Sequence, residues 1–436
     1  MKYKWSVFTV RYVLVGGNVL VKNFLTGAIA ILENEVMDLM DMWLDSQTQF
    51  APNSLETLSG ENGFIVPEDK DEFHEYQNFF LHTRNEQAKL FTLHFLPTMK
   101  CQLNCPYCFE HGVKRQGTMT DIILCQSICW LDRYLEVNPE VASLKCVLFG
   151  GEPLLVKRLV NESLSKFKSL AEKREKEYWT EITTNGILLD VDTAKMLKQY
   201  NLRRVQITLD GPKELHDTRR VGSDRHPTFD RIITNVRMLL DGGHVSRINL
   251  RLSLDIQTAD LLPNLIRFIS TLGYGDKIHL SLGIVVPSIG TTIKTTAEMT
   301  IAQKAIIAWQ VAKECGFSVP DEFLVGPWCV AIAKHSAVLQ SNGALQKCFC
   351  TVGRSIFDFG HVSGLPISYT QDIRFEKFSR INRCVEEECP YLPICGGGCI
   401  HDSIVKNGKK GFKQRFCQRK LIATLNQGLL FLRYSS

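Results

Sequence analysis

The 436-residue sequence lacks several features that would assign it to familiar classes of protein. No apolar run approaches the roughly eighteen residues that a membrane-spanning helix needs, so no membrane partner is expected. The net charge of +5 is spread along the chain without a long basic tract, which argues against a nucleic-acid partner. The N-terminus has neither the uninterrupted apolar region nor the cleavage site of an export signal. These absences favour a cytoplasmic protein.

Cysteine, in contrast, is abundant, with fifteen residues in the chain. A reducing cytoplasm does not support a framework of disulfides, so ligation of metal ions or iron–sulfur clusters is the expected use of these thiols. The composition, with 44% hydrophobic and 22% charged residues, is that of a globular protein. The length predicts about two or three domains.

Three of the cysteines, Cys101, Cys105 and Cys108, lie in one short segment directly after an apolar run that predicts a buried strand. Three thiolates can bind three irons of a cubane [4Fe–4S] cluster and leave the fourth iron without a protein ligand, whereas an electron-transfer ferredoxin normally supplies four. A zinc site is the alternative, but it needs four ligands and no nearby His or Cys completes this one. The segment therefore predicts a cluster whose open iron binds a substrate.

Predicted strands and helices alternate from about residue 90 to residue 300, which implies a parallel sheet with crossover helices. The predicted strands are residues 90–96, 144–149, 177–184, 203–209, 248–254 and 277–286. Polar motifs follow three of these strands, at residues 150–153, 183–186 and 208–211. Parallel barrels carry their chemistry at these carboxyl ends of the strands.

The cysteine spacing, Tyr107 before the third cysteine, and the Gly-Gly-Glu-Pro motif after Phe149 resemble those of radical S-adenosylmethionine (SAM) enzymes. The resemblance implies an α/β fold with an open (β/α)6 partial barrel. It also implies that the amino and carboxylate groups of SAM bind the open iron. One electron from the cluster would then cleave SAM to methionine and a 5′-deoxyadenosyl radical that abstracts hydrogen from carbon.

The resemblance further implies which residues contact SAM. Gly151 and Thr208 would touch it, and Arg220 would reach its carboxylate or ribose. Glycines without a Cβ would let the backbone approach the methionine group, and Glu152 would supply a charge or an acceptor near its ammonium. Tyr107 would lie beside the cluster and the adenosine. The complete expected set is Tyr107, Gly150, Gly151, Glu152, Pro153, Thr208, Asp210, Arg220 and Ile284, the last of these beside the adenine.

Cysteines crowd into the C-terminal quarter in a pattern that resembles the SPASM extension of peptide and protein maturases, which holds two auxiliary [4Fe–4S] clusters. With the SAM cluster, this makes three clusters. The ligands implied for the distal cluster are Cys384, Cys389, Cys395 and Cys417. Those implied for the proximal cluster are Cys329, Cys348 and Cys399, with a fourth ligand that is Cys350 or Cys315 or is missing. The spacing from Cys384 to Cys389 departs from the pattern, with four residues between them where two are usual. Zinc is the alternative for the block of Cys384, Cys389, Cys395 and Cys399.

Residues 1–88 predict a small separate unit with a hairpin at Gly16-Gly17, a third strand, and a helix over residues 33–43. The unit is similar to the peptide-recognition domain of many peptide-modifying radical enzymes, which binds the leader of a precursor peptide. A structural cap on the barrel is the alternative. The remaining predicted divisions are a radical SAM core over residues 89–300, a bridging region over 301–325, and the SPASM domain with a C-terminal helix over 326–436.

The reaction implied first is a thioether crosslink from a cysteine sulfur to a carbon in a ribosomally made precursor peptide, with flavodoxin or ferredoxin as reductant. A carbon–carbon or cyclophane link is second, and no residue decides between the two or is assigned as catalytic. Formylglycine formation, as in anaerobic sulfatase maturation, is third. That subfamily tends to have Gln at the position of Phe149 and a catalytic Asp at that of Phe349. An iron–sulfur electron carrier or a zinc-bound peptide-binding scaffold is the non-enzymatic alternative.

Cys125, Cys129 and Cys146 receive no role. The first two share a predicted helix with apolar residues, which predicts buried thiols, and Cys146 lies within a predicted buried strand.

Overall fold

The structure is a computed structural model, and it describes most of the chain. The described residues are 2–46, 58–87, 89–110, 112–113, 117–222, 226–289, 298–324, 329–364, 378–408 and 416–435.

Among these residues, nine strands form one central sheet in the order β11-β10-β9-β8-β7-β6-β12-β13-β14. The parallel part consists of β6 (Leu90–Phe95), β7 (Ser143–Leu148), β8 (Glu177–Thr184), β9 (Leu202–Leu209), β10 (Ile248–Leu254) and β11 (Ile278–Ile284). These are the strands that the sequence predicts, each to within two residues at either end. The predicted α/β partial barrel is confirmed.

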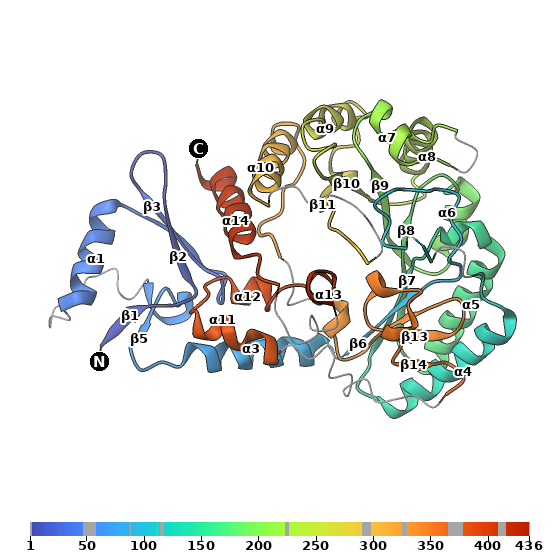
Figure 1. Ribbon diagram of the computed structural model, residues 1–436, viewed down its shortest axis with the longest axis horizontal. Helices are drawn as coiled ribbons and strands as arrows, with labels where there is room; N and C mark the ends of the chain where they lie inside the picture. The colour runs from blue at the N-terminus through green and yellow to red at the C-terminus, as the bar shows by residue number, and fades with distance from the viewer. Residues whose placement is uncertain are drawn as a thin grey trace.

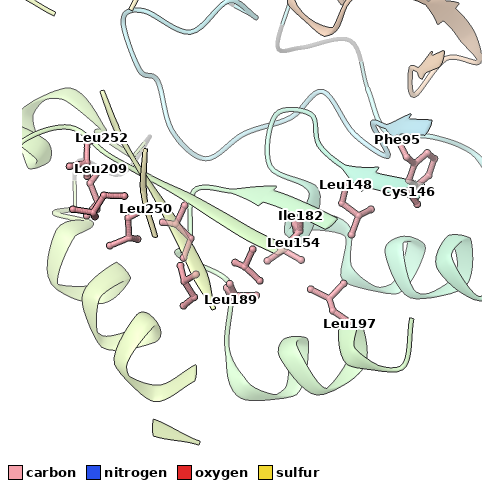
Figure 2. Packing of buried hydrophobic residues seen from close by; sticks show 14 of the residues in the cluster. Phe95, Cys146, Leu148, Leu154, Ile182, Leu189, Leu197, Leu209, Leu250 and Leu252 are labelled. Atoms are coloured by element: carbon pink, nitrogen blue, oxygen red, sulfur yellow. The ribbon is translucent and has the colours of Figure 1, made fainter. Parts of the chain in front are cut away.

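Helices cover the outer face of the parallel strands (Figure 1). They are α4 (Asp121–Val137), α5 (Lys157–Lys173), α6 (Val191–Lys198), α7 (Lys213–Arg219), α8 (Phe229–Asp241), α9 (Leu262–Ser270) and α10 (Glu298–Glu314). Capping side chains fix where two of them begin. Thr120 accepts a hydrogen bond from the backbone N–H of Ile123, and Asp190 accepts one from that of Thr193. Figure 2 shows the apolar layer between strands and helices, which contains Leu250 of β10.

The C-terminal region extends the sheet at its first strand. β12 (Ser336–Leu339) pairs in parallel with β6 and is followed by the antiparallel strands β13 (Ala344–Gln346) and β14 (Gly360–His361). The helices of this region are α11 (Phe378–Glu386), α12 (Leu392–Cys395), α13 (Ile400–Asn407) and α14 (Arg419–Tyr434). Leu425 and Leu429 of α14 join the main core. The sequence argument did not foresee that this region would share the barrel's sheet.

The N-terminal elements form two small sheets. β2 (Thr9–Val13), β3 (Val19–Asn23) and β4 (Ile29–Leu32) make one, and β1 (Tyr3–Trp5) pairs with β5 (Ile65–Pro67) in the other. The predicted hairpin is confirmed, since Val13 pairs with Val19 across Gly16 and Gly17, whose φ angles are 102° and 92°. The helices are α1 (Asn34–Ser46) and α3 (Glu72–Gln87).

The N-terminal elements pack against the C-terminal helices, at the side of the molecule away from α4 to α9 (Figure 1). Phe8, Phe24 and Tyr76 share a buried cluster with Cys384 and Tyr391. Residues 2–87, so far as they are described, are therefore fixed to the region that carries the distal cysteines. Nowhere in the described ranges does a helix combine the length and the apolar character that a bilayer crossing requires.

Candidate active site

The loop with Cys101, Cys105 and Cys108 leaves β6 at the carboxyl end of the parallel strands. Backbone hydrogen bonds shape it. The N–H of Leu103 donates to Sγ of Cys101 at 3.4 Å, and the N–H of Cys108 donates to the carbonyl oxygen of Cys105 at 3.2 Å. Cys105 is buried, and the other two thiols are half-buried. The loop therefore presents three thiols at the position where barrel enzymes place their chemistry.

Gly150 and Gly151, which follow β7, pack against the start of this loop. A Cβ on Gly151 would lie 2.2 Å from the carbonyl oxygen of Lys100, and a Cβ on Gly150 would lie 2.6 Å from that of Thr98. The N–H of Glu152 donates to the same Lys100 oxygen at 2.8 Å. The glycines were expected to make room for SAM. The structure shows that they make room for the backbone of the cysteine loop, and their contact with SAM stays a prediction.

The Glu152 side chain is fully buried and ties the ends of β7 and β8 together. Its carboxylate accepts hydrogen bonds from the backbone N–H groups of Leu154 and Asn185 and from the hydroxyl of Thr184, at 2.8 to 3.0 Å. Burial raises the pKa of Glu152, against the effect of these hydrogen bonds. Pro153 begins the short 3-10 helix that follows. A contact between Glu152 and the SAM ammonium stays a prediction.

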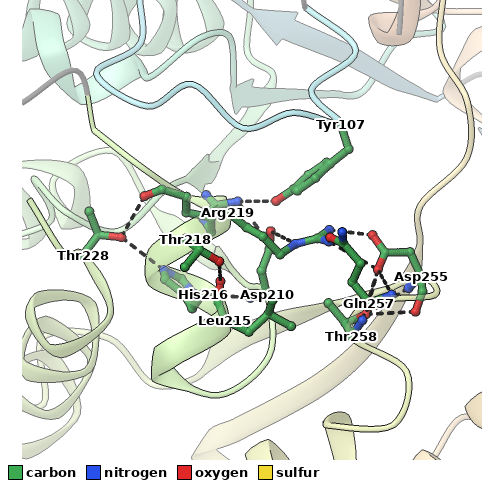
Figure 3. A network of polar contacts seen from close by, with 11 residues as sticks. Tyr107, Asp210, Leu215, His216, Thr218, Arg219, Thr228, Asp255, Gln257 and Thr258 are labelled. Carbon is green, nitrogen blue, oxygen red and sulfur yellow. Dashed lines mark hydrogen bonds and ion pairs between the residues drawn. The ribbon is translucent and has the colours of Figure 1, made fainter. Parts of the chain in front are cut away.

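A polar network joins the cysteine loop to the end of β9 (Figure 3). Arg220 donates to the hydroxyl of Tyr107 at 2.9 Å, and the Arg219 guanidinium lies 5.1 Å from the centre of the Tyr107 ring. Arg219 also pairs with Asp210 at 3.3 Å and with Asp255 at 2.5 Å. Burial raises the pKa of Tyr107, which keeps the phenol neutral. Tyr107, Asp210 and Arg220 are thus brought together as the resemblance implies.

Unpaired polar atoms in this region fit a polar ligand such as SAM. Among the described residues, Oδ1 of Asp210, Nε of Arg220 and Oγ of Ser253 are buried without a hydrogen-bond partner. Buried polar groups are rarely left unpaired in native proteins. The set offers both acceptors and donors, as the amino-acid and ribose groups of SAM require. Arg220 and Arg219 hold the pKa of Asp210 below its usual value although burial opposes this, so the carboxylate is charged.

The two remaining predicted SAM contacts lie on neighbouring parts of the sheet. Thr208, on β9, is half-buried and stands beside Arg251 of β10 in register. Ile284 ends β11, is half-buried, and packs against the main core.

The distal cysteines converge as the resemblance implies. Cys384, Cys389, Cys395 and Cys417 line one small cavity. The unusual spacing has a local cause at the end of α11. Glu388 adopts a left-handed φ of 45°, and the N–H of Cys389 returns to the carbonyl oxygen of Cys384 at 3.0 Å. This helix ending brings the two thiols to the same cavity across four intervening residues.

Cys350 shares a small apolar cluster with Cys329 and Cys348, and Cys315 does not. The half-buried Cys350 thiol donates a hydrogen bond to the buried Cys348 thiol, which lowers the pKa of Cys348 to about 7. Cys399 interacts electrostatically with Cys348 and Cys329. Cys315, in contrast, packs against the main core at the end of α10.

Within the described ranges, no three His, Cys, Asp or Glu side chains converge as ligands of a single metal ion do. A cubane cluster instead takes each thiolate on a separate iron. The donor chemistry of the three cysteine groups, all thiols, fits such clusters.

Phe149 and Phe349, the residues used above against formylglycine formation, contact each other with ring centres 5.5 Å apart. Phe109, next to Cys108, stacks on Phe149 at 5.7 Å. His94 of β6 lies 5.6 Å from Phe349, and burial lowers its pKa to about 3. Phe109, Phe149 and Phe349 thus form an aromatic wall, and two of its members adjoin Cys108 and Cys348 in the sequence.

Sequence reasoning missed Arg219, Asp255 and Arg251. The adjacent arginines at positions 219 and 220 gave a signal that could have suggested a second cation at the site. The prediction for Cys125 and Cys129 was wrong, because the structure exposes both. Their helix, α4, turns these positions away from its buried face, which carries Leu124 and Leu131 among others. Cys146 is buried as predicted.

The fold and site define an α/β barrel protein with a three-thiol loop at the carboxyl ends of its strands. Residues 95–269 match the Radical SAM superfamily. A cysteine-type anaerobic sulfatase-maturating enzyme of Clostridium novyi is 29% identical over 141 residues, which is 32% of this chain and 37% of that protein. A GTP 3′,8-cyclase of Clostridium perfringens is 31% identical over 172 residues, 38% of this chain and 47% of that protein. The matches thus span less than half of these curated relatives.

Two solved structures share the fold. Native anSMEcpe with bound AdoMet has a TM-score of 0.58 at 16% identity, over 79% of this chain and 97% of that one. Streptococcus suis SuiB bound to precursor peptide SuiA has a TM-score of 0.52 at 16% identity, over 95% of this chain and all of that one (100%). Residues 95–269 therefore match the radical SAM superfamily, and the two solved structures show that the chain shares their fold.

Proposed function

We propose that this protein is a peptide maturase that uses a SAM-derived radical to install thioether crosslinks in a ribosomally synthesised precursor peptide. The observation that carries the proposal is the three-thiol loop, whose Tyr107 accepts a hydrogen bond from Arg220. Two further groups of thiols follow it in the C-terminal region. An electron carrier would not need the buried, partly unpaired polar network beside the loop. SAM bound there supplies a 5′-deoxyadenosyl radical on one-electron reduction.

Each part of the site has a proposed task. Cys101, Cys105 and Cys108 hold three irons of the SAM cluster, and Arg220 binds the carboxylate or ribose of SAM. The charged Asp210 accepts hydrogen bonds from SAM. The aromatic wall of Phe109, Phe149 and Phe349 keeps water from the radical's surroundings. The core of this unit is residues 89–300, joined by a bridging region, residues 301–325, to a cluster-bearing domain over 326–436.

The two C-terminal thiol groups hold auxiliary [4Fe–4S] clusters in this proposal. Cys384, Cys389, Cys395 and Cys417 form the distal set. The proximal set is Cys329, Cys348, Cys350 and Cys399, because Cys350 packs with Cys329 and Cys348, whereas Cys315 lies in another core. Four thiols would leave no iron of the proximal cluster open. The three clusters receive electrons from a flavodoxin or a ferredoxin.

The N-terminal unit, residues 1–88, binds the leader of the precursor in this proposal. β4 has only β3 as a described neighbour, so its outer edge can accept an added strand. SuiB, whose structure with its precursor peptide covers this region, supports the assignment. The ring of Phe24 lies 5.2 Å from that of Tyr391, so the unit is packed beside the distal thiols.

Formylglycine formation is the second candidate, favoured by the sulfatase-maturating relatives. Phe349 argues against it, because a ring packed between His94 and Phe149 leaves no carboxylate at that position. Carbon–carbon crosslinking uses the same initial radical and is distinguished by its product.

The test is mass spectrometry of the anaerobically reconstituted, reduced enzyme with SAM and the small peptide encoded beside its gene. A peptide about two mass units lighter per crosslink, with cysteines that no longer alkylate, is the expected result. The same mass loss with every cysteine still alkylable would replace the thioether by a carbon–carbon link. Aldehyde formation without a crosslink would favour the sulfatase-type reaction.

A further inference from the structure

Arg251 lies in the middle of β10 and faces the interior of the barrel. Its neighbours Leu250 and Leu252 are fully buried in the apolar layer under the helices (Figure 2). Since side chains alternate along a strand, Arg251 points the other way. In register it stands between Thr208 of β9 and Ser281 of β11. The guanidinium is thus on the same inner surface as a predicted SAM contact.

The chain leaves room for this guanidinium at Gly283 of β11. A Cβ on Gly283 would lie 2.2 Å from Cζ of Arg251 and 2.4 Å from its Nε. The φ angle of Gly283 is not in the left-handed region, so the backbone itself does not require glycine there. Glycine at position 283 therefore leaves the space that the Arg251 guanidinium occupies.

No residue in the described part of the chain forms a hydrogen bond or an ion pair with the Arg251 guanidinium. Asp210 acts on it only through space, and that carboxylate lies 3.3 Å from Arg219 and 3.9 Å from Arg220. Asp255 is paired with Arg219. Both aspartates therefore pair with Arg219 or Arg220, and neither pairs with Arg251. The half-buried guanidinium thus keeps its N–H donors free of protein partners and can offer them to a ligand with a negative group.

The Arg251 guanidinium lies near both the predicted SAM site and the proximal thiols. Its electrostatic neighbours include Tyr107 and Arg220 from the SAM site and Cys350 from the proximal thiols. A group held there lies between the source of the radical and the proximal cysteines. Guanidinium binds carboxylates with paired hydrogen bonds of fixed geometry, so it can orient what it binds.

We propose that Arg251 is a receptor for a carboxylate group inside the barrel, carried by an acidic residue of the peptide substrate or by the amino-acid end of SAM. The inference deepens the proposed function and rests on it. The resemblance assigns Arg220 to the carboxylate or the ribose of SAM, so the peptide is the favoured source. The substrate would then have an Asp, a Glu or its C-terminus close to the modified residue.

The test compares the wild-type enzyme with Arg251→Gln and with Arg204→Gln as the matched control. Arg204 is on the neighbouring strand, is half-exposed, and lies 3.5 Å from Glu181. Two binding measurements are made on reconstituted, unreduced enzyme. One is the affinity for SAM and for decarboxylated SAM by equilibrium dialysis. The other is the rise in melting temperature caused by N-acetylglutamate amide, relative to its neutral analogue N-acetylglutamine amide, with and without SAM.

If the peptide is the source, Arg251→Gln abolishes the preference for the glutamate probe, keeps SAM affinity within about twofold, and the wild-type preference persists with SAM bound. If SAM is the source, the variant weakens SAM by about tenfold or more without affecting decarboxylated SAM. Arg204→Gln behaves as wild type in both cases. Unchanged SAM affinity together with an unchanged glutamate preference in Arg251→Gln would overturn the proposal.

Two further observations keep the test decisive. Arg251→Gln without ligand should melt at about the wild-type temperature, since the half-buried guanidinium has no hydrogen bond or ion pair with the described residues. Gly283→Ala keeps the charge but displaces it, and should lose the same binding as Arg251→Gln. Neither measurement needs SAM cleavage or crosslinking. Binding that depends on Arg251 in an enzyme that makes no crosslink would refute the proposed function and leave the carboxylate receptor standing.

Discussion

Gly151→Ala should disrupt the three-thiol loop more than any other single methyl group added near it. The new Cβ would lie 2.2 Å from the Lys100 carbonyl oxygen and 2.8 Å from the carbonyl carbon of Met99. Ordinary contacts need about 3.5 Å, so the backbone must move by about 1 Å. That movement strains the hydrogen bond from Glu152 N–H to Lys100, which is 2.8 Å long. Overpacking costs about 1–3 kcal/mol and the lost hydrogen bond about 0.5–1.5 kcal/mol.

The assay is iron and sulfide content after anaerobic reconstitution, together with SAM affinity. Gly151→Ala should lose the iron of one cluster and bind SAM weakly. Gly273→Ala is the matched control, because its Cβ would meet no atom within 4 Å although its φ of +79° makes alanine strained. The control should keep wild-type iron. Wild-type iron content and SAM affinity in Gly151→Ala would refute the account of this glycine.

Three other predictions follow from the structure. Cys350→Ala should remove iron from the proximal cluster while Cys315→Ala keeps full iron, and equal iron in both would reject Cys350 as a ligand. Burial lowers the pKa of His216 to about 3, so below about pH 6.5 the unfolded chain binds a proton that the folded chain does not. Stability should therefore fall with acid by up to about 1.4 kcal/mol per pH unit in urea titrations, and His216→Gln should fall less steeply. Lys22→Ala should destabilise the protein by about 3 kcal/mol, because it breaks the 2.5 Å ion pair that joins the buried Lys22 to Glu322; an unchanged urea midpoint would contradict this.

The sequence predicted the parallel strands well because each is an apolar run bounded by a helix of clear period, and the bounds of 177–184 and 248–254 match β8 and β10. It did not predict β12, which pairs with β6 across more than two hundred residues of chain, since short strands have no local pattern that names a distant partner. Cys125 and Cys129 show the same limit on a helix. Their apolar neighbours indicated burial, but the tertiary structure decided which face was covered.

At the site, the spacing of the cysteines in the sequence indicated which thiols belong together, but not which residues each site residue contacts. The cysteines of the distal set converge on one cavity, as their pattern implied. The choice between Cys350 and Cys315 depended on which core each joined, which spacing does not encode. The use of Gly151 depended on the path of the Lys100 backbone. Arg251 belongs to no sequence motif, and only its place inside the barrel, without a partner among the described residues, distinguishes it.

The measurement that tests the central claim most directly is 5′-deoxyadenosine formation from SAM by the reduced, reconstituted protein, followed by liquid chromatography and mass spectrometry. Wild type and Cys125→Ala should both form it, since Cys125 is exposed and remote from the loop's function. A variant with Cys101, Cys105 and Cys108 all changed to Ala should form none while keeping the iron of the auxiliary clusters. No 5′-deoxyadenosine from wild type with a full complement of iron and strong reductant, or equal formation by the triple variant, would contradict the account.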